Sequence, residues 1–158
     1  MKTIFLIPII FLALVSCSIE TDSVVERNGL YYAESGFNGL PFTGEVTGKE
    51  KGKVQDGKKI GQWVGYHDNG DLRYRGRYKN GKEEGEWIYY YDNGQLKYKG
   101  NYKNGVMEGD WVYYYDTGQV SSKGNYKNGK GDGEWVYYYD TGQVSSKGNY
   151  KDGEKVGD

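Results

Sequence analysis

Two of the side-chain types best suited to catalysis or metal binding occur once each in this sequence, as Cys17 and His67. One cysteine cannot form an intramolecular disulfide, and one cysteine with one histidine is too few for a conventional zinc site. A catalytic His67 would need a carboxylate or nucleophile fixed beside it, but the neighbouring Asp68 would point to the opposite face of a strand. We therefore expect no enzyme activity, no metal and no cofactor, and we interpret His67 as a tolerated substitute for an aromatic residue.

A carboxylate recurs every 24 residues, at Glu86, Asp110 and Glu134. Such a ladder could bind Ca²⁺, which takes about six to eight oxygen ligands. Lysines are interspersed among these residues, however, and the sequence has no Asp-x-Asp cluster. We expect cross-strand ion pairs instead, each contributing roughly a few tenths of a kcal/mol.

Tyrosine recurs with the same spacing, at Tyr66, Tyr90, Tyr114 and Tyr138. Alternation along strands would place these four side chains in a row on the less buried face of a sheet. Tyrosine is rigid and amphipathic, which suits it to contact with a protein or to stacking on a glycan. We take this tyrosine row as the candidate binding surface. The alternative is that the row only covers the second face of the sheet, and the sequence favours neither interpretation.

An internal repeat must position these side chains. Tryptophans and glycines share its 24-residue period, at Trp63, Trp87, Trp111 and Trp135 and at Gly76, Gly100, Gly124 and Gly148. Residues 111–127 and 135–151 are identical. Trp and Tyr favour strands, and a fixed period indicates units that each pack only on their neighbours. We predict an all-β fold, an elongated single-layer array of antiparallel β-hairpins in which the four tryptophans form the repeat core.

Turn residues divide each unit into two short strands. Asn93-Gly94 is a strong hairpin signal, because both central residues of a type I′ turn need positive φ. A second turn is predicted at Asn80-Gly81, Asn104-Gly105 and Asn128-Gly129. Alternation places Trp111 on the packed face with the neighbouring tyrosines, where Gly100 in the preceding strand would leave room for its ring. The opposite face, which carries the lysines, is expected to be solvated.

The first 17 residues have the features of an export signal. Lys2 precedes an apolar run from Ile4 to Val15, whose 12 residues are fewer than the roughly 20 needed to span a bilayer. The sequence Leu14-Val15-Ser16-Cys17 resembles the bacterial lipobox. The resemblance implies that residues 1–16 are removed as a lipoprotein signal peptide and that Cys17 receives the lipid and its acyl chains. Ser18 in place of Asp further resembles signals for the outer membrane, so we expect a lipid anchor in the bacterial envelope, at the outer membrane or cell surface.

The remaining sequence divides into three parts. Residues 17–28 are polar and acidic and are predicted to be an acylated tether. Residues 29–60 lack the tryptophan and are predicted to be a degenerate first repeat that caps the array, and residues 61–158 form the array itself. The last strand is expected to leave an open edge, through which a homo-oligomer could form.

The partners are constrained by charge. The chain has 21 basic and 22 acidic residues and a formal net charge of −1. Nucleic acids are bound by surfaces with a basic excess, so we expect no nucleic-acid partner. The glycines also form no nucleotide-binding pattern.

The repeat resembles a known family. Tyr98-Lys-Gly-Asn-Tyr-Lys-Asn-Gly105, followed by Gly109, is similar to the core of the MORN repeat. Tyr90-Tyr-Asp-Asn-Gly-Gln-Leu96 is similar to the bacterial variant of that repeat, and with Gly-x-Trp it resembles the group known as YwqK-family antitoxins. The resemblance implies an elongated β structure that serves in protein contact or lipid contact.

These observations lead to one preferred function and two alternatives. The preferred function is a membrane-anchored envelope lipoprotein whose repeats bind an unidentified protein or glycan. The first alternative is an antitoxin or an envelope immunity protein that blocks a toxin. The second is a self-associating scaffold that uses the C-terminal edge.

Overall fold

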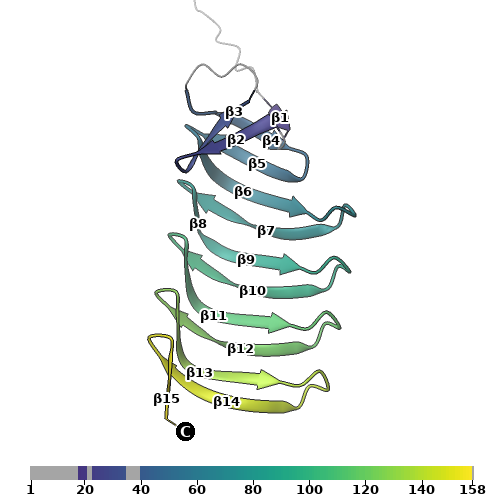
Figure 1. Ribbon diagram of the computed structural model, residues 1–158, viewed down its shortest axis with the longest axis vertical. Coiled ribbons are helices and arrows are strands. Elements are labelled where there is room, and N and C mark those ends of the chain that lie inside the picture. The colour runs from purple at the N-terminus through teal and green to yellow at the C-terminus, as the bar shows by residue number, and fades with distance from the viewer. Residues whose placement is uncertain (1–17, 21–22, 35–39, 158) are drawn as a thin grey trace, which may run out of the picture.

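The computed structural model describes residues 18–20, 23–34 and 40–157. Their strands form a 13-stranded sheet and a separate two-stranded sheet. The large sheet is one long layer in which the strands from β4 onward follow one another in chain order, except that the short β8 pairs only with β7 (Figure 1). This arrangement confirms the predicted all-β array of hairpins. Cys17 and the expected signal peptide lie outside the described residues.

The strands have the following bounds: β1 Ser18–Glu20, β2 Val24–Arg27, β3 Leu30–Ala33, β4 Gly44–Thr47, β5 Glu50–Gln55, β6 Lys58–Tyr66, β7 Leu72–Lys79, β8 Lys82–Glu83, β9 Gly85–Tyr90, β10 Leu96–Lys103, β11 Val106–Tyr114, β12 Val120–Lys127, β13 Lys130–Tyr138, β14 Val144–Lys151 and β15 Glu154–Val156.

The two flanks of the sheet use different turns. On one flank, drawn on the left in Figure 1, Asn104 and Gly105 have φ values of 54° and 82°, as the predicted type I′ turn requires. On the other flank Asn93-Gly94 lies in the predicted hairpin turn between β9 and β10. The predicted type I′ conformation is wrong, however, because of these two residues only Gly94 has positive φ. The Gly94 N–H donates to the Tyr91 carbonyl and the Tyr91 N–H donates to the Gln95 carbonyl. This pattern is a three-residue loop that closes with a glycine bulge.

Each strand that carries a core tryptophan is bent by a bulge. Between β10 and β11, Lys99 pairs with Val112 and Asn101 pairs with Glu108, so that residues 109–111 lie opposite Gly100 alone. Gly109 takes a positive φ of 75° within this bulge. The extra residues let the Trp111 ring fold back over Gly100, where any Cβ atom would overlap the indole.

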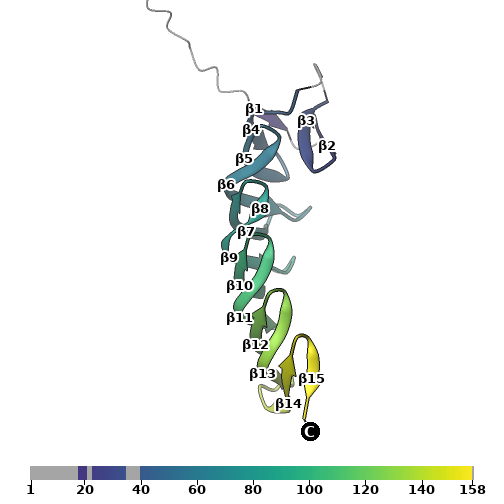
Figure 2. The ribbon, with the colours of Figure 1, turned by 90° about the vertical axis from the view of Figure 1, so that its left-hand side faces the viewer.

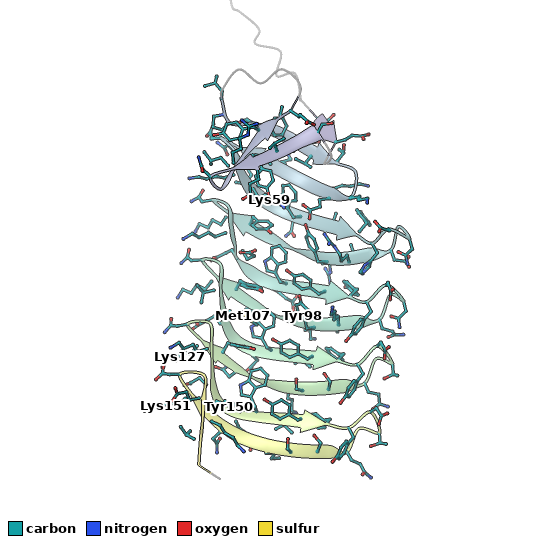
Figure 3. The ribbon with its side chains drawn as sticks, viewed as in Figure 1. Lys59, Tyr98, Met107, Lys127, Tyr150 and Lys151 are labelled. Atoms are coloured by element: carbon teal, nitrogen blue, oxygen red, sulfur yellow. The ribbon has the colours of Figure 1, made fainter. Side chains whose placement is uncertain are left out.

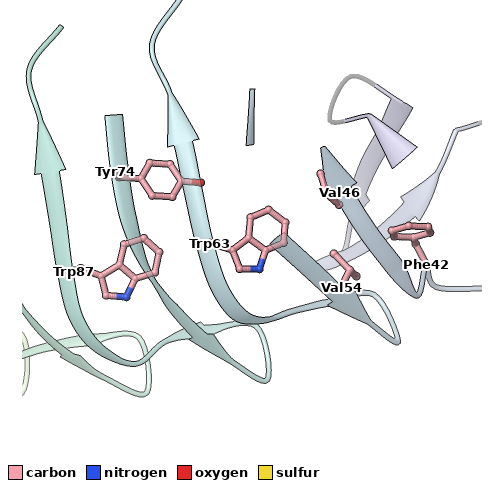
Figure 4. Packing of buried hydrophobic residues seen from close by; sticks show 6 residues of the cluster. All are labelled: Phe42, Val46, Val54, Trp63, Tyr74 and Trp87. Atoms are coloured by element: carbon pink, nitrogen blue, oxygen red, sulfur yellow. The ribbon is translucent and has the colours of Figure 1, made fainter. Parts of the chain in front are cut away.

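The same overlap recurs along the sheet and defines its core. Glycine and tryptophan meet in this way at Gly52 and Trp63, Gly76 and Trp87, and Gly124 and Trp135. Trp63, Trp87 and Trp111 are each 1% exposed. Tyrosine rings fill the spaces between the indoles, as where Tyr102 meets Trp111 edge-on at 5.2 Å between ring centroids. A single layer of strands therefore buries its tryptophans by stacking them with tyrosines along one face, as Figure 4 shows for Trp63, Tyr74 and Trp87.

At the N-terminal end of the array, valine and phenylalanine side chains form the core in place of the tryptophan and tyrosine rings. Phe42, Val46 and Val54 are buried and extend the cluster that contains Trp63 (Figure 4). The hairpin of β2 and β3 lies beside this end of the sheet, as Figure 2 shows, and its Tyr31 packs against the cluster. Apolar side chains that would otherwise face water are covered by this hairpin.

The segment expected to be a tether is folded where the structure describes it. Strand β1 pairs in parallel with β4, from Ser18 opposite Glu45 to Glu20 opposite Thr47. Strand β2 pairs with β3, and Val24 packs against the N-terminal core. The polar composition of this segment concealed its short strands, because main-chain pairing needs few apolar side chains.

Candidate binding face

The tyrosine row lies on the face opposite the tryptophans, near the ends of β6, β9, β11 and β13. All four side chains are partly exposed. Cations on the preceding strands approach the rings: Lys51 Nζ lies 5.0 Å from the centre of the Tyr66 ring and Lys123 Nζ lies 5.8 Å from that of Tyr138. Arg75 Nε donates a long hydrogen bond of 3.4 Å to the Tyr90 hydroxyl. The structure thus shows tyrosine paired with a basic side chain at Tyr66, Tyr90 and Tyr138.

A shallow hollow runs beside the tyrosine row in the last two units. It has a volume of about 370 Å³, and its lining includes Val112, Val136 and Lys123. Asp110 and Glu134 also line it. The surface therefore combines apolar area, charges of both signs and tyrosine hydroxyls, a mixture that suits contact with another protein.

The carboxylate ladder makes hydrogen bonds and ion pairs within this face. The amide of Asn125 donates to Asp110 at 3.1 Å. Glu134 and Lys147 form an ion pair at 3.7 Å, with side chains 56% and 55% exposed. Exposed pairs of this kind contribute little to stability. No group of three or more metal-ligating side chains occurs among the described residues.

His67 has a structural contact. Its Nε2 lies 3.0 Å from the Tyr90 carbonyl oxygen, so that nitrogen carries the proton in this contact, because a carbonyl only accepts. In the next unit the hydroxyl of Tyr91 donates to the Tyr114 carbonyl at 2.8 Å. His67 occupies the position in its unit that Tyr91 occupies in the next. Its side chain makes the equivalent hydrogen bond to the backbone of the following unit.

A polar cluster that was not predicted from the sequence lies where strand β5 meets the first tryptophan-containing unit, residues 59–80. Glu50 receives hydrogen bonds from Lys59 Nζ at 2.9 Å and from the Tyr74 hydroxyl at 2.7 Å, and it also pairs with Arg73 at 3.2 Å. The Lys59 ammonium lies 4.1 Å from the centre of the Trp63 ring. The sequence did contain one indication of this cluster. Glu50 lies one period before Tyr74, so a charged residue occupies a position that is aromatic in the next unit.

This environment changes the acidity of the groups involved. Burial would raise the pKa of Glu50, but hydrogen bonds from Lys59 and Tyr74 and the nearby positive charges lower it below its usual value. Burial, followed by the hydrogen bond to Glu50, raises the pKa of Tyr74. Elsewhere on the aromatic face, burial raises the pKa of Tyr102 to about 12.

Comparison with known proteins identifies the repeat. The model of the MORN repeat variant matches residues 59–80, 83–104, 107–128 and 131–152. The chain belongs to the MORN repeat variant family. Members of this family are commonly binding modules, which agrees with the mixed surface beside the tyrosine row.

Other comparisons add little to the family assignment. No curated protein matches the chain. One similar solved structure is described as the crystal structure of the GtfA/B complex bound to UDP and GlcNAc, with 15% sequence identity and a TM-score of 0.26. That match covers 77% of this chain and 22% of the other. No helix in the described part of the chain is long and apolar enough to cross a membrane.

Proposed function

We propose that this MORN-variant chain is a non-enzymatic binding module that contacts a partner protein through the tyrosine row, Tyr66, Tyr90, Tyr114 and Tyr138. The observation that supports it most is the repeated pairing of a partly exposed tyrosine with a cation on the preceding strand. Tyrosine and arginine are, with tryptophan, the residue types enriched among those that contribute most at protein interfaces. A face built by repetition offers several such contacts at a fixed spacing.

Site-specific photo-crosslinking in the native cell tests this function. A photoreactive phenylalanine analogue at position 90 or 114 is expected to crosslink one partner. The same analogue at Tyr139, which is 56% exposed on a turn, serves as the matched control. The purified partner should then bind the Tyr90→Ala, Tyr114→Ala double variant at least about tenfold more weakly than the wild type. Equal crosslinking at position 139, or unchanged affinity of the double variant, would contradict the proposal.

We further propose that the module is held in the bacterial envelope by lipid on Cys17. The support is the lipobox-like sequence from Leu14 to Cys17 after a short apolar run. Two or more acyl chains anchor a protein stably, whereas one does so only marginally. The intact mass of the membrane-extracted protein should begin at Cys17 with added acyl mass, and the Cys17→Ser variant should lack both the cleavage and the added mass. A soluble chain that retains residues 1–16 would overturn this part of the proposal.

The resemblance to YwqK-family antitoxins gives the crosslinking experiment a specific alternative result. If the crosslinked partner is a toxin and the double variant no longer protects cells from it, the binding module acts as an immunity protein.

A further inference from the structure

In the first unit, the ammonium group of a lysine, Lys59, lies among three aromatic rings. Lys59 is only 7% exposed. Its ammonium lies 4.1 Å from the centre of the Trp63 ring and 5.3 Å from the ring centres of Tyr31 and Tyr78. Attraction between a positive charge and ring faces stabilises such an arrangement, most strongly where water is excluded. The position four residues before the repeat tryptophan therefore places a side chain against the aromatic face.

The residue at this position differs in every unit: Lys59, Glu83, Met107 and Gly131. Figure 3 labels Lys59 and Met107, which lie two periods apart along the sheet. In the fourth unit Gly131 has no side chain to place there. A Cβ atom at Gly131 would lie 3.3 Å from Nε1 of Trp135, so the space beside this glycine adjoins the indole.

The space beside Gly131 is a hollow with aromatic walls. Its volume is about 180 Å³, and its lining, here called the aromatic hollow, consists of Tyr126, Gly131, Trp135, Tyr137, Tyr150 and Gly153. The rings of Tyr126 and Tyr150 stand edge-on to Trp135, at interplanar angles of 86° and 74°. Trp135 is 6% exposed, whereas the other three repeat tryptophans are each 1% exposed. Four aromatic residues thus line a space at the position equivalent to that of the Lys59 side chain in the first unit.

The charges around the two positions differ. In the first unit Glu50 accepts a hydrogen bond from Lys59. The residue three periods after Glu50 is Ser122, so the fourth unit has no carboxylate at the corresponding position. A primary ammonium has three N–H donors to satisfy, whereas a quaternary ammonium has none. Recognition by aromatic faces alone is therefore suited to a quaternary cation.

We propose that the aromatic hollow binds a quaternary ammonium group, such as the trimethylammonium of choline, between Trp135, Tyr126 and Tyr150. This site lies on the tryptophan face, and it is independent of the protein partner proposed for the tyrosine row. The group could be supplied by a free solute or by a lipid head group, since both present the same trimethylammonium.

Titration with choline chloride, followed by NMR of the four indole N–H signals, tests the site. The Trp135 signal, assigned with the Trp135→Phe variant, is expected to shift alone. The neutral isostere 3,3-dimethyl-1-butanol should bind about fivefold more weakly, the ratio that corresponds to about 1 kcal/mol for one cation–π contact. Equal binding of the neutral alcohol, or no shift of the Trp135 signal at all, would overturn the proposal.

Two further variants, one that should remove the hollow and one that should create a second, distinguish loss of the site from misfolding. Gly131→Met should abolish the response to choline, and Met107 shows that the repeat accepts this residue at the same position. Met107→Gly should create a second hollow, so that the Trp111 signal also responds to choline. Retained choline binding in Gly131→Met, or no new response in Met107→Gly, would contradict the site. Vesicles of phosphatidylcholine, compared with vesicles of phosphatidylglycerol, then show whether a lipid head group or only a free solute enters the hollow.

Discussion

The indole of Trp111 in strand β11 lies over the backbone of Gly100 in strand β10, so that a Cβ atom at position 100 would overlap the ring. The bulge at residues 109–111 produces this contact, and the absence of a side chain at position 100 permits it. The indole cannot move away without breaking its edge-on contacts with Tyr102 and Tyr126. Glycine at this position is therefore required by packing.

Replacing Gly100 with alanine should lower the free energy of unfolding by about 1–3 kcal/mol, the usual penalty for an overpacked core. Gly148→Ala is the matched control, because the nearest atom to its added Cβ belongs to the flexible Lys155 side chain, at 3.0 Å. Urea unfolding monitored by tryptophan fluorescence measures both variants. Equal destabilisation of the two would show that the indole contact is not what excludes a side chain at position 100.

The fold could be predicted from the sequence because every unit repeats the same pattern of tryptophan, glycine and turn residues. The period of Trp and Gly placed Trp111 opposite Gly100, and alternation assigned the faces. The turn at Asn93-Gly94 was predicted at the right place but with the wrong conformation, because the dipeptide alone does not determine the loop length. That length depends on how Tyr91 pairs with Gln95 across the turn.

The candidate sites were harder to predict, because they depend on departures from the repeat. Glu50 and Lys59 contact each other, although they lie on different strands and neither belongs to a motif. The hollow at Gly131 exists because this position has no side chain. That absence is noticed only when Gly131 is compared with Lys59 and Met107, which occupy the equivalent positions in other units. The partner of the tyrosine row could not be predicted from the repeat pattern, because tyrosine side chains can bind many different protein surfaces.

Hydrogen bonds between successive turns should couple one unit to the next. The hydroxyl of Tyr115 donates to the Tyr138 carbonyl at 2.7 Å. Tyr115→Phe removes only this donor and leaves the carbonyl partly buried, so we expect a loss of about 0.5–1.5 kcal/mol in stability. Tyr139→Phe, at an exposed position in the last turn, is the control and should be nearly neutral. The comparison is best made by thermal unfolding, and a loss in both variants would refute a specific role for the Tyr115 bond.

The Glu50 cluster should make stability dependent on acidic pH. The pKa of Glu50 in the folded chain is lower than the usual value of 4.5, so its contribution is fully present above that value and is lost as the pH falls through the folded pKa. Glu50→Gln cannot titrate and leaves Lys59 without its anionic partner. The variant should be less stable than the wild type at pH 7, and the difference should shrink as the pH falls below 4.5 and through the lower pKa of Glu50 in the folded chain. A difference that is independent of pH would mean that the charge on Glu50 is not what stabilises the cluster.

The aromatic face should make stability dependent on alkaline pH, in the opposite direction. Burial, followed by the nearby Tyr98, raises the pKa of Tyr102 from 10.0 to about 12. The unfolded chain therefore releases this proton first, so the contribution of Tyr102 is complete below pH 10 and is lost as the pH rises through about 12. Tyr102→Phe has no proton to lose, so its stability should fall less steeply over this interval. Chemical unfolding at a series of pH values, with phenolate absorbance followed in parallel, measures both slopes. If the variant and the wild type lose stability equally, Tyr102 ionises as readily in the folded array as in the unfolded chain, and the stacked face does not exclude water from its hydroxyl.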